Sequence, residues 1–290
     1  MMRFAILLFW FWAASISPSW SAGEIGYVED FTGLASRYRV THDGHEIPMR
    51  LCLPLYVGDT IEALDDKARA TLRMIDHPEP VAWSRGDRDT KLTTSGAGTS
   101  FLSDLMNSTL AALSPFDEQK RDRVLTTIRG DGGGEFGVPL LESRQTISLG
   151  QKTIAVGWLP ASTLAEISIT DNKGKALVSK SKASGGIWLS PSLNLKPGQY
   201  RVTLVAGGSK VAGDIDVVDA LQIPHLPAEL TQENIPQSLR HTAQAVWLAA
   251  QSNGQYRLEA LQLVANDRST RSAAVLTEAL IAGKTIELPK

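Results

Sequence analysis

The sequence predicts a mainly β protein with helical segments, an α+β multidomain chain. Three observations lead to this fold class. Short alternating runs of apolar and polar residues, separated by turns, fill residues 25–92, and more short strands at spacings of about 8–12 residues fill 153–218. Apolar residues at helical spacing dominate only after residue 237. A length of 290 residues accommodates two or three such domains.

Composition excludes several classes of protein. Hydrophobic residues make up 43% and charged residues 21%, which is typical of a globular chain. A net charge of −2 provides no field for attracting nucleic acid, so no nucleic-acid partner is expected. The single cysteine, Cys52, excludes an intramolecular disulfide and a cysteine-based zinc cluster. We expect Cys52 to be a buried packing residue, and the alternative is a free reactive thiol.

The first 21 residues have the layout of a secretory signal peptide. Arg3 precedes an apolar run over 4–14, and Ser19 and Ser21 provide the small residues of a cleavage site. The run is shorter than the ~20 residues of a spanning helix, so an uncleaved anchor is the less favoured alternative. We therefore predict a signal peptide over 1–21 and a mature chain that begins at Ala22 or Gly23. That chain would be periplasmic or secreted, with no integral membrane span.

Residues 22–95 are predicted to form a β domain with one buried and one solvated face. Within Ala68–Asp76, the side chains of Ala68, Ala70, Leu72 and Met74 share one face, which is the pattern of an antiparallel sheet. Asp43-Gly44 is a hairpin-turn signal. The other expected strands cover Ile25–Glu29, Ser36–Val40 and Pro54–Ile61.

This β domain resembles the FecR-type periplasmic domain. The stretch Leu55–Ala63 (LYVGDTIEA) matches the family's l-x-x-G-D-x-I-x-T pattern, and Ala70–Asp76 (ATLRMID) matches its second motif, although His77 stands where the family has glycine. Within the first motif, we expect Gly58 to take a positive φ and Asp59 to cap backbone amides, so that both are structural turn residues. The resemblance implies a role in envelope signalling. Sigma-factor contact is not expected, because no cytoplasmic region precedes the apolar run.

Residues 96–138 are predicted to be a helical and loop linker, and residues 139–220 an immunoglobulin-like β-sandwich. The linker contains helix candidates over 99–113 and 117–129, followed by a glycine-rich loop over 129–139. The stretch Leu195–Val202 resembles an edge of immunoglobulin-like domains at which a tyrosine, here Tyr200, ties a corner to the backbone. The expected strands cover Thr153–Trp158, Ala165–Asp171, Ala176–Lys180, Gly186–Leu189, Gln199–Val205 and Val211–Val218.

Residues 221–290 are predicted to be helical, with helices over Gln237–Gln251, Tyr256–Ala265 and Ser272–Ala282. The first two resemble a single tetratricopeptide-like hairpin, and one such unit cannot bury a solenoid core by itself. We therefore expect the helices to pack on the sandwich or together as a cap. The alternative is a partner-binding groove between the first two helices, with Trp247 and Tyr256 as aromatic anchors.

Motifs for catalysis or cofactor binding are not evident, so no catalytic residue, cofactor or metal site is predicted. The spacing Gly132-x-Gly134-x-x-Gly137 lacks the preceding strand and following helix of a dinucleotide-binding loop. His42 and His45 flank a hairpin turn, and a solvated turn is favoured there over a metal site. Carboxylates also occur in pairs in loops, at Asp87/Asp89 and Asp131/Glu135.

The sequence thus favours an exported, non-catalytic binding or scaffold protein of the bacterial envelope, whose partner is an envelope protein. The competing hypothesis is a cell-wall or glycan-acting enzyme that uses the loop carboxylates, because glycoside hydrolysis needs two carboxylates across a cleft.

Overall fold

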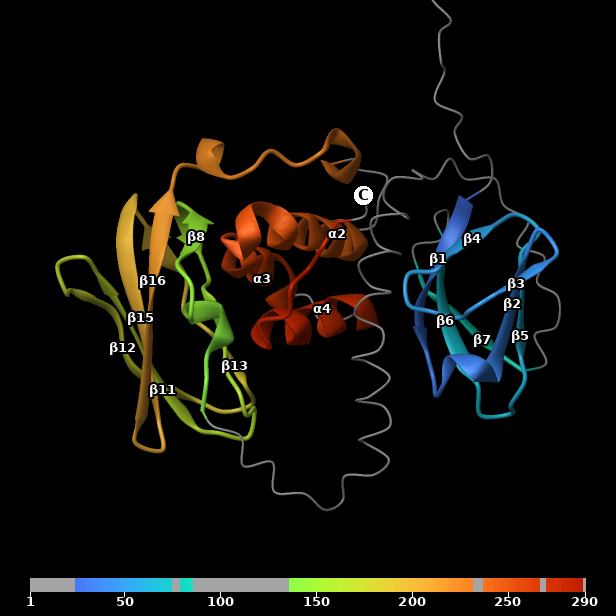
Figure 1. Ribbon diagram of the computed structural model, residues 1–290, viewed down its shortest axis with the longest axis horizontal. Coiled ribbons are helices and arrows are strands. Elements are labelled where there is room, and N and C mark those ends of the chain that lie inside the picture. Colours follow the sequence, from blue (N-terminus) through green and yellow to red (C-terminus); the bar gives the residue numbers. More distant parts are fainter. Residues whose placement is uncertain (1–23, 75–78, 86–135, 232–236, 267–269, 289–290) are drawn as a thin grey trace, which may run out of the picture.

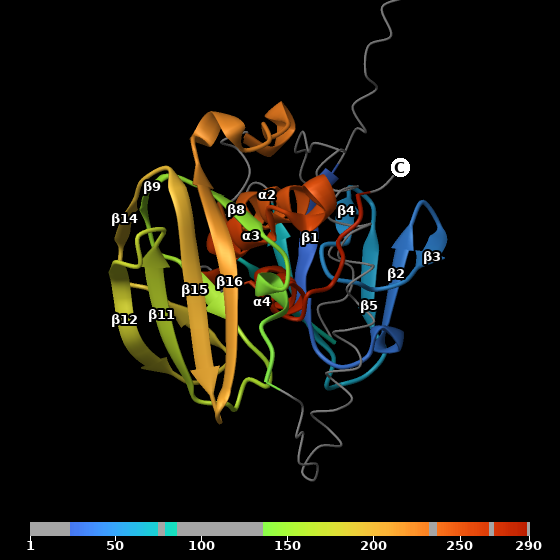
Figure 2. The same cartoon turned by 60° about the vertical axis from the view of Figure 1, so that its left-hand side comes forward.

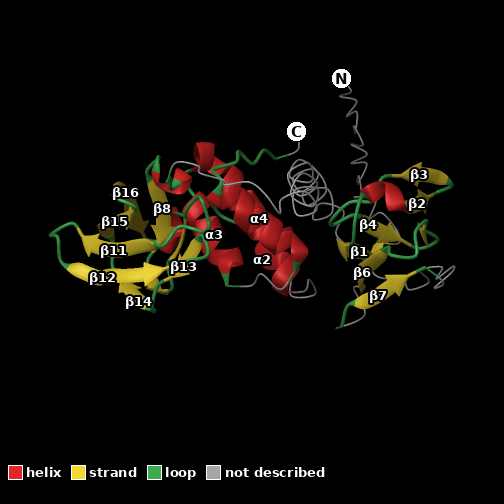
Figure 3. Ribbon diagram, turned by 90° about the horizontal axis from the view of Figure 1, so that it is seen from below, coloured by secondary structure: helices red, strands yellow, loops and turns green. Residues whose placement is uncertain are grey.

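The structure is a computed structural model that describes residues 24–74, 79–85, 136–231, 237–266 and 270–288. Two β-rich regions lie on either side of three C-terminal helices (Figures 1 and 3). This arrangement confirms the predicted fold class, a β-rich α+β protein. The predicted signal peptide and the helix candidates over 99–113 and 117–129 lie outside the described residues.

The N-terminal β region contains a four-stranded sheet in the order β4-β1-β6-β7 and a three-stranded sheet in the order β3-β2-β5. The predicted alternation in β6 is confirmed, because Ala70, Leu72 and Met74 are buried and the intervening side chains are not. The strands are β1 (Glu24–Phe31), β2 (Tyr38–His42), β3 (His45–Ile47), β4 (Pro54–Tyr56), β5 (Thr60–Ala63), β6 (Arg69–Met74) and β7 (Val81–Ser84), and a 3-10 helix covers Ala35–Arg37.

The hairpin between β2 and β3 turns at Asp43 and Gly44, as the sequence predicts. Both residues have positive φ, 47° and 78° respectively, which is the backbone of a type I′ turn. The side chain of His42, the last residue of β2, is directly opposite His45, the first residue of β3.

The second β region is built on a five-stranded sheet in the order β12-β11-β15-β16-β8 (Figure 2). Two further pairs, β10–β13 and β9–β14, complete it. The strands are β8 (Gln145–Ser148), β9 (Gly150–Lys152), β10 (Ala155–Gly157), β11 (Ala165–Asp171), β12 (Ala176–Ala183), β13 (Ile187–Leu189), β14 (Leu193–Leu195), β15 (Gly198–Ala206) and β16 (Ser209–Val218), with a 3-10 helix over Pro139–Leu141.

All six strands predicted in this region are present, and β8, β9 and β14 are additional. The corner at Tyr200 also has the expected geometry, because the tyrosine hydroxyl donates to the carbonyl oxygen of Lys196 at 3.0 Å and accepts from its amide at 3.1 Å. The specific immunoglobulin-like assignment stays a prediction.

The C-terminal helices are α2 (Gln237–Ala250), α3 (Arg257–Ala265) and α4 (Arg271–Ile281), with 3-10 helices over Ala220–Gln222, Ala228–Thr231 and Gln251–Gly254. Ser252 and Asn253 adopt left-handed backbone conformations in the connection between α2 and α3. No helix among the described residues is long and apolar enough to cross a membrane.

Polar contacts attach α3 to the second β region. The amide of Thr146 in β8 donates to the carbonyl oxygen of Gln255 at 2.9 Å, and the Gln145 side chain accepts from the amide of Leu258 at 3.0 Å. The amide of Ala155 in β10 donates to the side chain of Gln262 at 2.6 Å. These contacts cover the outer edge of β8, whose amide at Thr146 would otherwise lack a partner in the sheet.

An ion pair strengthens the same attachment. Lys152 Nζ lies 2.6 and 2.9 Å from the two carboxylate oxygens of Glu259 in α3. The amide and hydroxyl of Ser148 also donate to this carboxylate. Because the side chains of Lys152 and Glu259 are only 22% and 11% exposed, both charges depend on these partners.

Helix α4 contacts both β regions. It packs on β1 of the N-terminal sheet. At its other end, Ile281 lies so close to Gly157 in β10 that a Cβ at residue 157 would be 2.3 Å from Ile281 Cγ1. The helices therefore pack on the second β region and on one another, which agrees with the expected packing of the helices, and α4 also reaches the N-terminal sheet.

Candidate functional site

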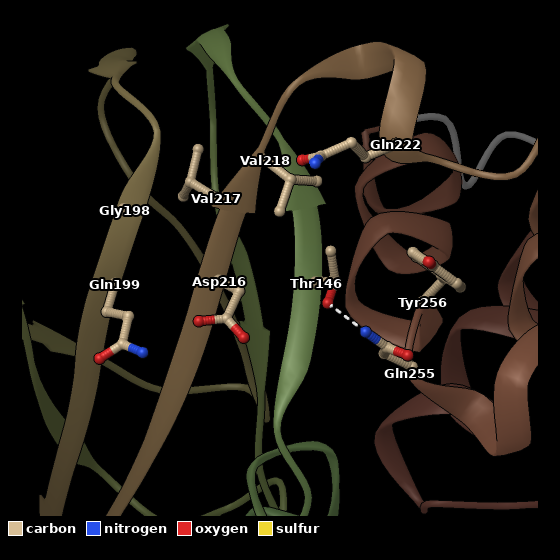
Figure 4. Close-up of a pocket in the computed structure, with 9 residues that line it drawn as sticks. All are labelled: Thr146, Gly198, Gln199, Asp216, Val217, Val218, Gln222, Gln255 and Tyr256. Carbon is tan, nitrogen blue, oxygen red and sulfur yellow. Dashed lines mark hydrogen bonds between the residues drawn. The ribbon is translucent and has the colours of Figure 1, made fainter.

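An open pocket of about 350 Å³ lies where the five-stranded sheet meets the start of α3 (Figure 4). Strands β8, β15 and β16, the 3-10 helix over Ala220–Gln222 and the residues just before α3 form its walls. The lining residues are Thr146, Gly198, Gln199, Asp216, Val217, Val218, Gln222, Gln255 and Tyr256.

Strand register brings the polar residues of the pocket into one row. Gln199 in β15 is paired with Asp216 in β16, and Asp216 is paired with Thr146 in β8. Directly paired residues on neighbouring strands share a face, so these three side chains lie side by side. Gln255 extends the row, because its side-chain amide donates to Thr146 Oγ1 at 2.8 Å.

The pocket has balanced charge and free hydrogen-bonding groups. The carboxylate of Asp216 lies 2.7 Å from Arg144 Nε. Gln199 and Gln222 are exposed, and their side-chain amides make no hydrogen bond within the described residues. Each amide offers both donors and an acceptor. The arrangement can therefore bind an uncharged ligand that carries hydroxyl or amide groups.

The two predicted partner-binding residues occupy different environments. Tyr256 is 9% exposed and lines the pocket beside α3. Trp247, near the C-terminal end of α2, is half-buried against the core and is not among the pocket residues. Sequence reasoning singled out Tyr256 for a groove between helices, and the structure places it at the junction with the sheet instead.

The two predicted turn residues lie between β4 and β5. Gly58 has a φ of +95°, in the region that favours glycine. Asp59 is buried, and its Oδ2 accepts from the amide of Tyr56 at 2.8 Å. Its Oδ1 lies 2.7 Å from His42 Nδ1, a contact that the turn pattern does not reveal.

Other predicted features are distant from the pocket or outside the described residues. The prediction that Cys52 is buried is confirmed, and burial raises the pKa of its thiol to about 12, which keeps the thiol protonated at neutral pH. The carboxylates Asp87, Asp89, Asp131 and Glu135 are outside the described residues.

Comparison with known proteins identifies no family. No protein-family model matches the chain, and no curated protein matches it significantly. Among solved structures, CopC from Methylosinus trichosporium OB3b is 19% identical with a TM-score of 0.23, over 29% of this chain and 90% of CopC. We therefore argue function from the residues of the chain itself.

Proposed function

We propose that this chain is an exported, non-catalytic binding or scaffold protein of the bacterial envelope. In this proposal residues 22–95 act as a FecR-like module and residues 139–220 as an immunoglobulin-like module. The observation that carries the binding role is the pocket beside α3, with its row of Gln199, Asp216, Thr146 and Gln255. The N-terminal layout of residues 1–21 supports export.

The chemistry of the pocket favours binding by hydrogen bonds. Asp216 is already paired with Arg144, so an additional charge on the ligand would gain little there. The amides of Gln199 and Gln222 can each donate and accept, which suits the hydroxyl groups of a saccharide or the amide groups of a peptide. An envelope protein or glycan would supply such groups.

A capture experiment tests the proposal. Purified wild-type protein is immobilised and incubated with a bacterial envelope fraction, and bound components are identified. Gln222→Arg places a long cation at the mouth of the pocket, and we expect it to reduce capture of a specific component by about fivefold or more, the effect of losing one or two hydrogen bonds.

The matched control is Gln151→Arg, because Gln151 is an exposed glutamine on β9 and is not among the pocket residues. Capture by this variant should equal that of the wild type. Equal capture by all three proteins, or a captured component that the purified protein turns over, would contradict the proposal.

A further inference from the structure

Three side chains form a second row at one end of the three-stranded sheet β3-β2-β5. His45 in β3 is directly opposite His42 in β2. On the other side, Thr41 is paired with Thr60 in β5, so the next residue of β2, His42, faces Asp59. The 2.7 Å contact between His42 Nδ1 and Asp59 Oδ1 follows from this register.

Asp59 determines which nitrogen of His42 is available. A carboxylate only accepts hydrogen bonds, so the proton of the neutral imidazole resides on Nδ1 and the lone pair on Nε2. Asp59 is 1% exposed and also accepts from the amide of Tyr56, so its position is well defined. The Tyr56 ring packs on the imidazole with centroids 4.7 Å apart. A histidine held through Nδ1 by a carboxylate is the arrangement of a metal ligand with its outer-shell partner.

Further potential ligands lie on the Nε2 side. The carboxylate oxygen Oδ2 of Asp43 is 3.6 Å from His42 Nε2. His45 is exposed, and directly opposed side chains in an antiparallel pair have Cβ atoms about 4.5–5.5 Å apart. Two imidazoles at this separation can reach one ion, and Asp43 can join them because its side chain is 86% exposed and free to rotate.

The neighbouring charges leave this side accessible to a cation. Successive side chains of a strand point to opposite faces, so Arg39, three residues before His42, lies on the face of β2 opposite to His42. Its guanidinium is held by Glu62 at 2.8 Å and by Glu46 at 3.6 Å. The charged groups closest to the imidazole of His42 are the carboxylates of Asp43 and Asp59.

We propose that the β2–β3 hairpin binds a divalent metal ion such as Ni²⁺, Cu²⁺ or Zn²⁺. His42 Nε2 and the imidazole of His45 are the nitrogen ligands, and Asp43 contributes an oxygen. Water completes the coordination, and Asp59 is the positioning residue. Imidazole and carboxylate ligands suit these ions. In the described residues as they stand, no group of three or more His, Cys, Asp and Glu side chains could hold a metal ion. The proposed site therefore requires the exposed side chains of His45 and Asp43 to change rotamer when the ion binds.

The test uses the full-length protein with Zn²⁺ as the probe. Titration calorimetry measures affinity, and NMR of the imidazole nitrogens identifies the coordinating atoms. In the free protein we expect the Nδ1–H tautomer for His42. Saturating Zn²⁺ should shift the signals of His42 Nε2 and one nitrogen of His45.

Three variants distinguish this site from adventitious binding. His45→Ala alters an exposed side chain and should weaken Zn²⁺ binding at least about tenfold while leaving the urea midpoint unchanged. Asp59→Asn removes the charge of the outer-shell partner and should weaken binding about 10–100-fold. His225→Ala changes another exposed histidine and should have no effect. Unchanged affinity in His45→Ala, or Zn²⁺ shifts confined to other histidines, would overturn the proposal.

Discussion

Removing the carboxylate of Glu259 is expected to weaken the attachment of α3 to the sheet substantially. Glu259→Leu leaves the ammonium of Lys152, only 22% exposed, without its counter-ion and with Ser148 Oγ as its remaining acceptor, and it leaves the amide of Ser148 without an acceptor. Breaking a fully buried ion pair costs about 3–5 kcal/mol, and the residual exposure of this pair favours the lower end. We therefore expect a loss of about 3 kcal/mol in the free energy of unfolding. Lys152→Met should cost less, about 2 kcal/mol, because Ser148 still donates to the carboxylate.

Urea unfolding followed by helical circular dichroism measures these losses, and the double variant completes a mutant cycle. Because either single change leaves a poorly solvated charge, the double variant should be more stable than the sum of the two losses predicts, by about 1.5 kcal/mol. The exposed pair Arg39–Glu62, at 2.8 Å, is the control and should show a coupling below about 1 kcal/mol. Losses for Lys152 and Glu259 that add to within about 0.5 kcal/mol would refute the reasoning.

Two further predictions concern the N-terminal β region. A Cβ at Gly58 would meet no atom within 4 Å, so the cost of Gly58→Val comes from the φ of +95° and should exceed about 1 kcal/mol in the free energy of unfolding. Asp59→Asn should cost less, because an amide oxygen can still accept from the amide of Tyr56. An unchanged urea midpoint for Gly58→Val would contradict the assignment of Gly58 to the turn. Folding raises the pKa of Cys52 from 9.0 to about 12, so its contribution to stability is complete below about pH 9 and is lost as the pH rises toward 12. Relative to Cys52→Ala, the wild type should lose about 1.4 kcal/mol per pH unit within that window, and parallel stability curves would contradict the assignment.

Local patterns predicted most of the secondary structure. The alternation that ends at Met74, the Asp43-Gly44 turn and the helical spacing from Gln237 each depend on residues that are close in the sequence. The strands β8, β9 and β14, of three or four residues each, were not predicted. Their extended backbone is stabilised by partners far along the chain, such as β16 for β8.

The candidate sites are harder to predict from the sequence than the strands that carry them. Tyr256 was identified as an aromatic anchor, but its neighbours Thr146 and Asp216 come from strands that are paired in parallel, and that register follows no local signal. In the hairpin, the spacing of His42 and His45 is readable, whereas the contact of His42 with Asp59 requires the pairing of β2 with β5.

The sequence by itself determined the succession of strands, turns and helices, because propensity, periodicity and glycine backbone freedom act over a few residues. Tertiary structure alone decided which strand ends meet α3, which charges are buried together at Lys152 and Glu259, and which carboxylate orients His42. Those pairings join residues separated by 17 to 113 positions. They depend on the burial of a shared core and on strand register, which no short segment specifies.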